Sequence, residues 1–268
     1  MDEQTAITLA TLREMKTRRQ RIACLTAYDA SFAGLLDEAG VDVLLVGDSL
    51  GMVIQGHDST LPVTVNDIVY HSQAVRRGCR RALLIADMPF MGDASPAQAL
   101  DNAARLMKEG GAQVVKLEGG RVMGDTVQLL SSRGIPVCAH LGLQPQSVHK
   151  VGGYRVQGRD ADTASRIIED ARLLEQAGAD LLVLECVPAA LAEEITGILT
   201  IPVIGIGAGP ACDGQVLVLY DMLGMTPGKP PRFVRNFMLE AGSVAEAVEA
   251  YVKAVRDGEY PAPEHSFS

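Results

Sequence analysis

The chain has 268 residues, 47% of them hydrophobic and 21% charged, which is the balance of a globular protein rather than of a disordered one. Lys and Arg total 24 against 33 Asp and Glu, so the net charge is -9, and that sign argues against a surface built to bind nucleic acid. No apolar run approaches the length of a membrane span and the acidic start is unlike a signal peptide, so we expect a cytoplasmic protein without membrane contact.

The first twenty residues predict a helix that stands outside the repeating pattern and covers the bottom of the fold. Eight short apolar runs follow it, each rich in Val, Ile and Leu. Near-continuous hydrophobicity over so few residues is typical of strands buried on both faces of a parallel sheet. In chain order the predicted strands are residues 22–28, 41–49, 81–90, 112–119, 135–143, 179–187, 201–209 and 215–225.

Helical segments with recognisable starts lie between these runs. Thr64 and Ser95 each begin a capping pattern, and Pro96 occupies the first helical position after Ser95. Ser243 begins the same pattern before a segment with one apolar face at helical spacing. Strand and helix therefore alternate about eight times. This order predicts one α/β domain over residues 1–268, a single (β/α)8 TIM barrel with an extra N-terminal helix.

An open, doubly wound parallel sheet is the structural alternative. Such folds usually carry a glycine-rich turn after the first strand, and here the first strand runs into residues 26–29 (TAYD) instead. No linker, low-complexity tract or shift in composition divides the chain. We therefore favour the closed barrel.

Ionisable side chains end the apolar rows of five consecutive predicted strands. Because side chains alternate along a strand, residues two apart share a face. On this pattern Leu44 and Val46 lead to Asp48, Leu83 and Ile85 to Asp87, Val114 to Lys116 and Glu118, Pro136 and Cys138 to His140, and Leu181 and Val183 to Glu185. Barrel enzymes have their active sites at the carboxyl ends of the strands, and desolvating this many charges without a function is costly. The pattern therefore predicts an active site at that rim.

Each of these residues has a simpler structural interpretation when taken alone. Asp48 or Asp87 would most simply cap a helix. His140 would be a hydrogen-bonded core histidine, and Lys116 would pair with Glu118 at the rim. Caps and ion pairs do not require alternation with an apolar row in five neighbouring strands, so the coincidence favours function.

Three of the predicted pore-facing residues are carboxylates on adjacent strands, which repel one another unless a cation lies between them. Adjacent strands are about 5 Å apart, so Asp48, Asp87 and Glu118 can converge on one ion. Oxygen ligands without clustered His or Cys favour Mg²⁺, with other divalent ions possible. Lys116 supplies a positive charge for a substrate carboxylate. Glu185, two strands further round, is placed to act as a base.

One glycine-rich segment ends the seventh predicted strand, and two glycine-containing loops follow the ends of other predicted strands. Residues 205–209 (GIGAG) lack the third glycine of the dinucleotide-binding pattern, because Pro210 follows. We expect the backbone there to approach a ligand closely, with a plain tight turn as the alternative. Loops 51–62 and 144–159 are expected to be mobile covers that exclude water from the site.

The five cysteines predict neither a disulfide framework nor a zinc knuckle. They are odd in number, scattered, and contain no CxxC pair: Cys24, Cys79, Cys138, Cys186 and Cys212. Reduced thiols are the expectation.

At these residues the sequence resembles the ketopantoate hydroxymethyltransferase family, over about residues 26–267. The resemblance is carried by motifs at 25–29 (LTAYD), 46–51 (VGDSLG), 55–60 (QGHDST), 86–90 (ADMPF), 116–120 (KLEGG), 140–143 (HLGL), 152–154 (GGY), 184–188 (LECVP), 204–209 (IGIGAG) and 264–267 (EHSF). So many motifs in one order make the resemblance specific. No position expected to do chemistry departs from the family pattern, whereas Ser268 and the N-terminal segment fit it less well.

The resemblance implies a metal and a keto acid at the predicted rim. Mg²⁺ would be bound through Asp48, Asp87 and Glu118. The keto acid, 3-methyl-2-oxobutanoate, would be held by Asp48, Ser49, Asp87 and Lys116.

The resemblance also implies a proton acceptor, a second substrate and an assembly. Glu185 would be the proton acceptor, and we place His140 among the substrate-binding residues. The one-carbon donor would be 5,10-methylenetetrahydrofolate, and the product 2-dehydropantoate in pantothenate biosynthesis. A cytoplasmic homodecamer is implied, for which the sequence itself offers only Phe233, Phe237 and Met238 as apolar residues that a monomer would leave exposed.

Two rival functions remain at this point. The first is a metal-dependent carbon–carbon lyase of the phosphoenolpyruvate mutase and isocitrate lyase type, whose barrels are similar. Those lyases carry a catalytic Cys in a flexible loop with Lys and Gly, and no such segment is present here. The second is a barrel that only binds a metabolite or a partner, which gives no reason for Lys116, Glu118 and Glu185 to share the pore.

Overall fold

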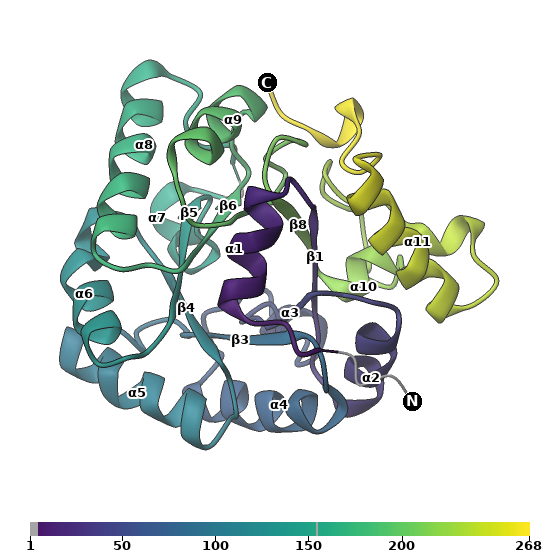
Figure 1. The fold of residues 1–268 in the computed structure, drawn as a ribbon, viewed down its shortest axis with the longest axis horizontal. Coiled ribbons are helices and arrows are strands. Elements are labelled where there is room, and N and C mark those ends of the chain that lie inside the picture. The colour runs from purple at the N-terminus through teal and green to yellow at the C-terminus, as the bar shows by residue number, and fades with distance from the viewer. Residues whose placement is uncertain (1–4, 154) are drawn as a thin grey trace.

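Eight parallel strands close into a barrel in the computed structural model, which describes residues 5–153 and 155–268 (Figure 1). The strands are β1 (Ile22–Thr26), β2 (Val43–Val46), β3 (Leu83–Asp87), β4 (Val114–Glu118), β5 (Val137–Gly142), β6 (Leu181–Glu185), β7 (Val203–Ile206) and β8 (Gly214–Leu217). Each strand pairs with the next, and β1 pairs with β8, so the sheet has no free edge. The predicted (β/α)8 TIM barrel is confirmed.

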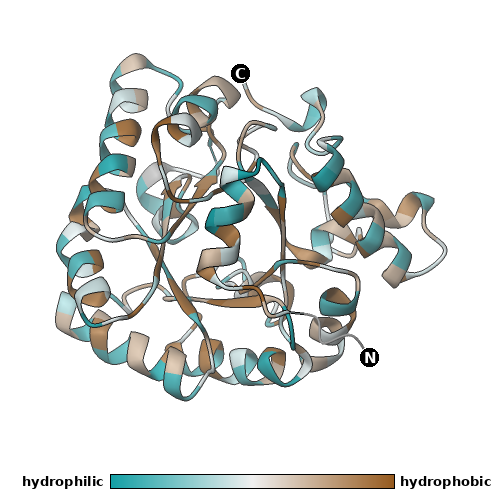
Figure 2. Ribbon diagram, viewed as in Figure 1, coloured by the Kyte–Doolittle hydropathy of each residue, from teal (hydrophilic) through white to brown (hydrophobic). Residues whose placement is uncertain are grey.

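Helices lie between the strands and cover the outside of the barrel (Figure 1). They are α1 (Leu9–Thr17), α2 (Ala30–Glu38), α3 (Leu50–Val53), α4 (Val65–Gly78), α5 (Pro96–Lys108), α6 (Gly124–Ser132), α7 (Val148–Val151), α8 (Ala161–Gln176), α9 (Ala189–Ile198), α10 (Leu219–Met222) and α11 (Val244–Asp257). Four short 3-10 turns join them: η1 (Arg121–Met123), η2 (Pro145–Ser147), η3 (Phe237–Glu240) and η4 (Pro263–His265). Figure 2 shows largely hydrophobic strands inside a ring of helices that carry hydrophilic residues as well.

The helix starts follow the sequence signals. The hydroxyl of Thr64 accepts from the backbone N–H of Asp67, and the Asp67 carboxylate accepts from the backbone of Thr64 at 2.8 Å, which is a complete capping box. Ser95 and Ser243 each accept from the backbone N–H three residues later. These bonds satisfy donors that a helix terminus otherwise leaves free.

Helix α1 lies across the amino ends of the strands, as its predicted role requires. Arg13 pairs with Asp180 at 2.5 Å, and Lys16 pairs with Asp213 at 2.7 Å. These two acids immediately precede β6 and β8. Leu12, which belongs to this helix, is fully buried. The extra helix therefore closes the bottom of the barrel.

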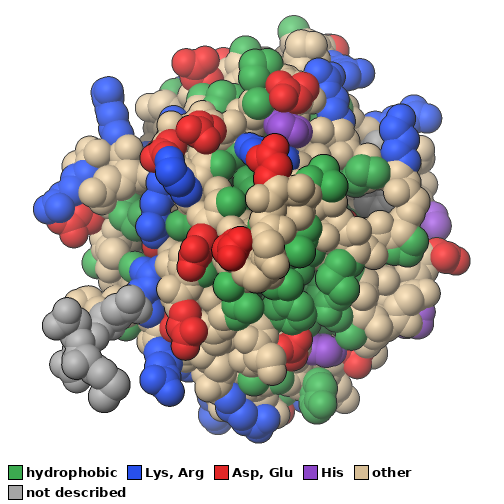
Figure 3. Space-filling view, turned by 90° about the vertical axis from the view of Figure 1, so that its right-hand side faces the viewer, with side chains coloured by type: hydrophobic (Ala, Val, Ile, Leu, Met, Phe, Trp, Pro, Cys, Tyr) green, Lys and Arg blue, Asp and Glu red, His purple; other side chains and the backbone are tan. Residues whose placement is uncertain are grey.

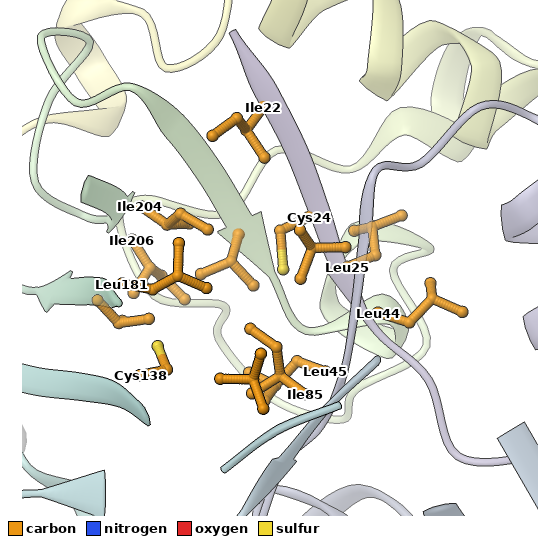
Figure 4. Packing of buried hydrophobic residues seen from close by; sticks show 14 of the residues in the cluster. Ile22, Cys24, Leu25, Leu44, Leu45, Ile85, Cys138, Leu181, Ile204 and Ile206 are labelled. Carbon is orange, nitrogen blue, oxygen red and sulfur yellow. The ribbon is translucent and has the colours of Figure 1, made fainter. Parts of the chain in front are cut away.

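Apolar side chains fill the barrel between α1 and its opposite end. Figure 4 shows Ile22 and Cys24 of β1 with Cys138, Leu181 and Ile204 from the facing strands. All five are buried, with at most 2% of any of them exposed. The interior is a packed core rather than a pore, which leaves only the carboxyl ends of the strands for a site.

The eighth predicted strand, 215–225, is wrong in its second half. Strand β8 ends at Leu217, and the next residues form the short helix α10. Leu219 and Met222 of α10 are fully buried. A short helix buried in this way shows the same unbroken apolar run as a strand, so periodicity does not distinguish them.

Charged side chains of both signs are spread over the face seen in Figure 3, among groups of hydrophobic ones. Among the described residues, no helix combines the length and the apolar character that crossing a membrane demands.

Candidate active site

A cavity of about 1000 Å³ opens at the carboxyl ends of the strands. All the site residues predicted from the sequence line it: Asp48, Ser49, Asp87, Lys116, Glu118, His140 and Glu185. They come from five segments of the chain, at or just after the ends of β2 to β6. The structure thus brings the predicted residues together at one place.

The alternation predicted for the second strand is wrong by one residue. Leu45 pairs in register with Ile85 and lines the cavity, whereas Leu44 is not among the lining residues. Leu44 therefore belongs to the outer face. Asp48 reaches the cavity for a different reason, because β2 ends at Val46 and the chain then turns.

Lys116 and Asp87 form a buried ion pair. They are register partners on β4 and β3, and Lys116 Nζ lies 2.5 Å from Asp87 Oδ1. Burial alone lowers the pKa of Lys116, but the neighbouring carboxylates, led by Asp87, raise it above its usual value. The other Asp87 oxygen accepts from the backbone N–H of Asp48 at 3.1 Å. Both oxygens of Asp87 are therefore held in place.

Gln146, in η2, connects three strand ends and was not predicted from the sequence. Its side-chain Nε2 donates to Oδ2 of Asp48 and to the carbonyl of Met88, both at 2.9 Å. Its backbone N–H donates to Oε2 of Glu118 at 3.1 Å. A single residue of the 144–159 loop thus holds two of the predicted metal ligands.

His140 lies between two carboxylates. Its Nδ1 is 3.2 Å from Oε1 of Glu118, and its Nε2 is 3.2 Å from Oε2 of Glu185. Neither contact meets hydrogen-bond geometry, so both are electrostatic contacts between close, poorly aligned atoms. Burial and Lys116 lower the pKa of His140, but the two carboxylates raise it to about 9. The two carboxylates therefore favour the charged form of His140.

Negative charge accumulates on the side of the cavity near Asp48. Burial raises the pKa of Asp48 well above its usual value, and the charges of Asp87 and Glu118 raise it further. Burial also raises the pKa of Glu118, but His140, Lys116 and the backbone N–H of Gln146 together bring it below its usual value. Two basic side chains, Lys116 and His140, face four carboxylates at the strand ends, those of Asp48, Asp87, Glu118 and Glu185, so negative charge is in excess when all are ionised, and a bound cation would offset it.

The carboxylates do not form a finished metal cluster. Within residues 5–153 and 155–268, no group of three or more His, Cys, Asp or Glu side chains is arranged to hold a metal ion. Asp87 is paired with Lys116, and Asp48 is hydrogen-bonded to Gln146. The donor set still fits a hard divalent cation, since it is made of carboxylate oxygens and Glu118 Oε1 has no hydrogen-bond partner in the described chain.

Ser49 lies beside the acidic side chains and is held by an aromatic residue. The hydroxyls of Tyr28 and Ser49 are 2.8 Å apart, and His71 Nδ1 lies 2.7 Å from the carbonyl of Tyr28. Tyr28 belongs to the LTAYD motif, whose Thr26 lines the cavity whereas Tyr28 is not among the lining residues.

The GIGAG segment packs against its own chain, and not against a ligand-sized space as we expected. Gly207 has φ of +59°, and a Cβ there would lie 2.8 Å from the ring of Phe233 and 3.0 Å from that of Phe267. A Cβ on Gly209 would lie 2.6 Å from Ala189. The glycines thus allow two aromatic rings and a helix start to close on the end of β7.

Both predicted cover loops line the cavity. Residues of 51–62 do so through His57 and Asp58, and residues of 144–159 through Pro145 and Val156. Tyr154 lies outside the described residues. Motion of these loops stays a prediction.

The tail residues predicted to serve assembly are largely buried within the chain. Phe233 is 8% exposed and lines the cavity, and Phe237 is 4% exposed. Phe237 packs edge-to-face on Tyr251 with ring centroids 5.5 Å apart. They therefore give no reason to expect an interface, and the expected assembly loses its support from the sequence itself.

Comparison with known proteins yields one family. The family model for ketopantoate hydroxymethyltransferase matches residues 6–263. The 3-methyl-2-oxobutanoate hydroxymethyltransferase of Nitrosococcus oceani is 62% identical over 97% of this chain and 99% of that protein. The enzyme of the same name from Halorhodospira halophila is 60% identical over 98% of this chain and 95% of that protein.

Solved structures of lower identity share the barrel. Phosphoenolpyruvate phosphomutase from Streptomyces platensis has a TM-score of 0.61 at 13% identity, covering 81% of this chain and 82% of that one. Phosphonopyruvate hydrolase in complex with oxalate and Mg²⁺ has a TM-score of 0.60 at 13% identity, covering 96% and 92%. Identity this low shows a common fold and does not favour a lyase.

Proposed function

This chain belongs to the ketopantoate hydroxymethyltransferase family, and we propose that the acidic cavity at its barrel mouth is where the family reaction takes place. The chain is a 3-methyl-2-oxobutanoate hydroxymethyltransferase, a transferase of pantothenate biosynthesis. The acceptor is 3-methyl-2-oxobutanoate, the proposed donor is 5,10-methylenetetrahydrofolate, and the product is 2-dehydropantoate. The observation that carries the assignment to this cavity is the convergence of all the predicted site residues there.

Asp48, Asp87 and Glu118 are the residues that would hold a divalent cation, with Mg²⁺ as the expected ion. Their oxygen donors and their uncompensated charge support this placement. A bound cation would supply Lewis acidity that stabilises negative charge on the keto oxygen of the substrate.

Lys116 and Ser49 are placed to bind the keto acid itself. The charged amino group of Lys116 is buried at the cavity wall, where a substrate carboxylate gains most from it. Ser49 offers a hydroxyl whose orientation Tyr28 fixes. Together they would orient the carbon next to the keto group toward β6.

Glu185 is the proposed base that removes the proton from that carbon. It ends β6, and its side chain is 15% exposed at the cavity. His140 lies between it and Glu118, with one ring nitrogen 3.2 Å from an oxygen of each, and its raised pKa favours the form that already carries both ring protons. Desolvation of the site by the cover loops would protect the resulting carbanion from protonation by water.

A homodecamer in the cytoplasm remains part of the proposal on family grounds alone. The barrel mouth would stay accessible in such an assembly, because both substrates must enter there.

The proposal is tested by a single assay. The purified protein is mixed with 3-methyl-2-oxobutanoate, 5,10-methylenetetrahydrofolate and Mg²⁺, and 2-dehydropantoate is measured by mass spectrometry. Product should form, disappear on addition of EDTA and return with excess Mg²⁺. Absence of product under all these conditions would refute the function.

A further inference from the structure

The cavity has a second half that the keto acid does not need. Asp48, Asp87 and Lys116 at its inner end are at most 4% exposed, whereas Lys229 and Arg232 at its rim are exposed. A volume of about 1000 Å³ is at the upper end of what a drug-sized ligand fills. A small keto acid at the inner end therefore leaves the outer half for another molecule.

We call this outer half the rim chamber and define it by residues from α10, the segment after it and the C-terminal segment. They are Tyr220, Pro227, Lys229, Arg232, Phe233 and Phe267. All six come from parts of the chain beyond the strands, so the rim chamber is built separately from the acidic inner end.

One wall of the rim chamber is aromatic and fixed in place. The carbonyl of Phe233 accepts from the hydroxyl of Tyr260 at 2.6 Å, and the carbonyl of Phe267 accepts from the backbone N–H of Ala189 at 2.9 Å. Both rings contact the space that Gly207 leaves by lacking a Cβ. Rigid rings at a cavity wall are suited to packing against a flat ring of a ligand.

The rim also presents two cations without partners of opposite charge. In the described part of the chain, neither Lys229 nor Arg232 forms an ion pair, although Asp58 and Asp221 line the same cavity. Arg232 is anchored by Nε, which donates to the carbonyl of Glu264 at 2.8 Å, and its guanidinium lies 5.7 Å from the ring centroid of Phe267. The anchored side chain can still bind a carboxylate through its terminal nitrogens.

We propose that the rim chamber binds the folate co-substrate, with Phe233 and Phe267 against its ring systems and Lys229 and Arg232 on the carboxylates of its glutamate tail. This inference rests on the proposed function, which supplies a folate as the donor. A folate carries flat aromatic rings at one end and carboxylates at the other, and the chamber offers aromatic rings and cations. The tail would then point outward, with the one-carbon unit facing Glu185 and the keto acid.

The proposal is tested with Lys229→Gln, Arg232→Gln and the double variant. Each single change should raise the KM for 5,10-methylenetetrahydrofolate about two- to fivefold, which is the range for a charge pair at an accessible rim. The KM for the keto acid should change less than about twofold. For a donor with a longer polyglutamate tail, the rise in KM caused by these changes should be larger, because the longer tail brings more carboxylates to the rim. Added salt should raise the folate KM of the wild type and leave that of the double variant nearly unchanged.

Matched controls are Lys108→Gln and Arg133→Gln. Both residues are exposed, and they lie at the other end of the barrel, at the ends of α5 and α6. They should leave both KM values unchanged. Phe267→Leu keeps an apolar side chain at the wall and should weaken folate binding without altering salt dependence.

Direct binding of tetrahydrofolate by calorimetry separates this inference from the proposed function. If the wild type makes no 2-dehydropantoate, the function fails, and calorimetry still decides whether the rim chamber binds a folate. Tetrahydrofolate affinity that is equal in the wild type and the double variant would overturn the inference. A double variant that loses affinity for the keto acid instead would also overturn it.

Discussion

The side-chain nitrogen of Gln146 donates a 2.9 Å hydrogen bond to Oδ2 of Asp48, across 98 residues of sequence. The two residues follow β5 and β2, which are not neighbours in the barrel. Gln146 therefore acts across the mouth of the barrel and ties a loop to a predicted metal ligand. It is a positioning residue by this geometry, since its contacts are to Asp48, Glu118 and Met88.

Gln146→Leu should weaken Mg²⁺ binding by about tenfold. The change removes a hydrogen bond to a carboxylate, and such bonds contribute about 1.5–3 kcal/mol. Calorimetric titration of the protein with Mg²⁺ measures the effect without reference to turnover. Gln144→Leu is the matched control, because its side chain makes no hydrogen bond among the described residues. Equal Mg²⁺ affinity in wild type and Gln146→Leu would remove the positioning role.

Asp48→Asn should abolish turnover and yet stabilise the metal-free protein. Burial and Asp87 raise the pKa of Asp48, so the folded state holds its proton more tightly than the unfolded state. Stability from this group is present at low pH and is lost as pH rises, which makes the ionised Asp48 unfavourable at neutral pH. Removing the charge should raise Tm in EDTA by about 2–4 °C, the shift that roughly 1 kcal/mol gives in a chain of this size.

The same variant should no longer bind the keto acid in the presence of Mg²⁺, because the cation is expected to be part of the substrate's anchor. Calorimetry with 3-methyl-2-oxobutanoate and Mg²⁺ measures this loss. A variant that binds the keto acid normally would exclude Asp48 as a metal ligand.

Glu185→Gln should bind the keto acid and lose proton removal. Wild-type protein with Mg²⁺ should exchange the C3 hydrogen of 3-methyl-2-oxobutanoate for deuterium when no folate is present, and NMR follows this exchange. The variant should lose exchange and turnover together by on the order of 100-fold or more. If it exchanged at the wild-type rate and failed only in transfer, another group would be the base. A charged His140 is poorly suited to that role, so a water molecule would be the next candidate.

All five thiols should be unreactive in the native protein. They are free and buried, and burial is the largest cause of a raised pKa for each, to about 11 for Cys79 and about 12 for Cys138 and Cys212. Because the thiolate is the nucleophile, iodoacetamide near neutral pH should label the native chain at least about 100-fold more slowly than the unfolded chain. Mass spectrometry counts the labels. Rapid native labelling at Cys186, which lines the cavity at 6% exposed, would contradict the expectation.

The protein should assemble into a homo-oligomer, with a decamer expected from the family. Light scattering at micromolar concentration measures the mass directly. A mass of 28.5 kDa would show a monomer and would refute the expected assembly.

The order of strands and helices was predictable because a buried parallel strand and an amphipathic helix have different hydrophobic periods. Four of the five strand-end alternations were also right, since residues such as Asp87 and Lys116 are register partners in the sheet. The alternation predicted for β2 was wrong, because this strand has only four residues and Asp48 lies in the turn that follows it. A pattern of alternation does not show where a short strand stops.

Gln146 and the rim chamber could not be predicted from local patterns. Gln146 forms its contacts over 28, 58 and 98 residues of sequence, and a single amide in a loop carries no periodic signal. Phe233 was visible as an apolar tail residue, which suggested assembly. Only the fold shows that it closes on Gly207 and lines the cavity.

The closed bottom of the barrel has a kinetic consequence. Because α1 and the packed core block the amino ends of the strands, the inner end of the cavity is reached from the carboxyl side of the barrel, where the rim chamber forms part of the mouth in the described chain. A folate bound at the rim would stand between Asp48 and bulk solvent. We therefore expect a compulsory order, in which the keto acid binds before the folate and tetrahydrofolate leaves before 2-dehydropantoate. Folate in excess should then be a competitive inhibitor with respect to the keto acid, because it occupies the entrance before the keto acid has bound.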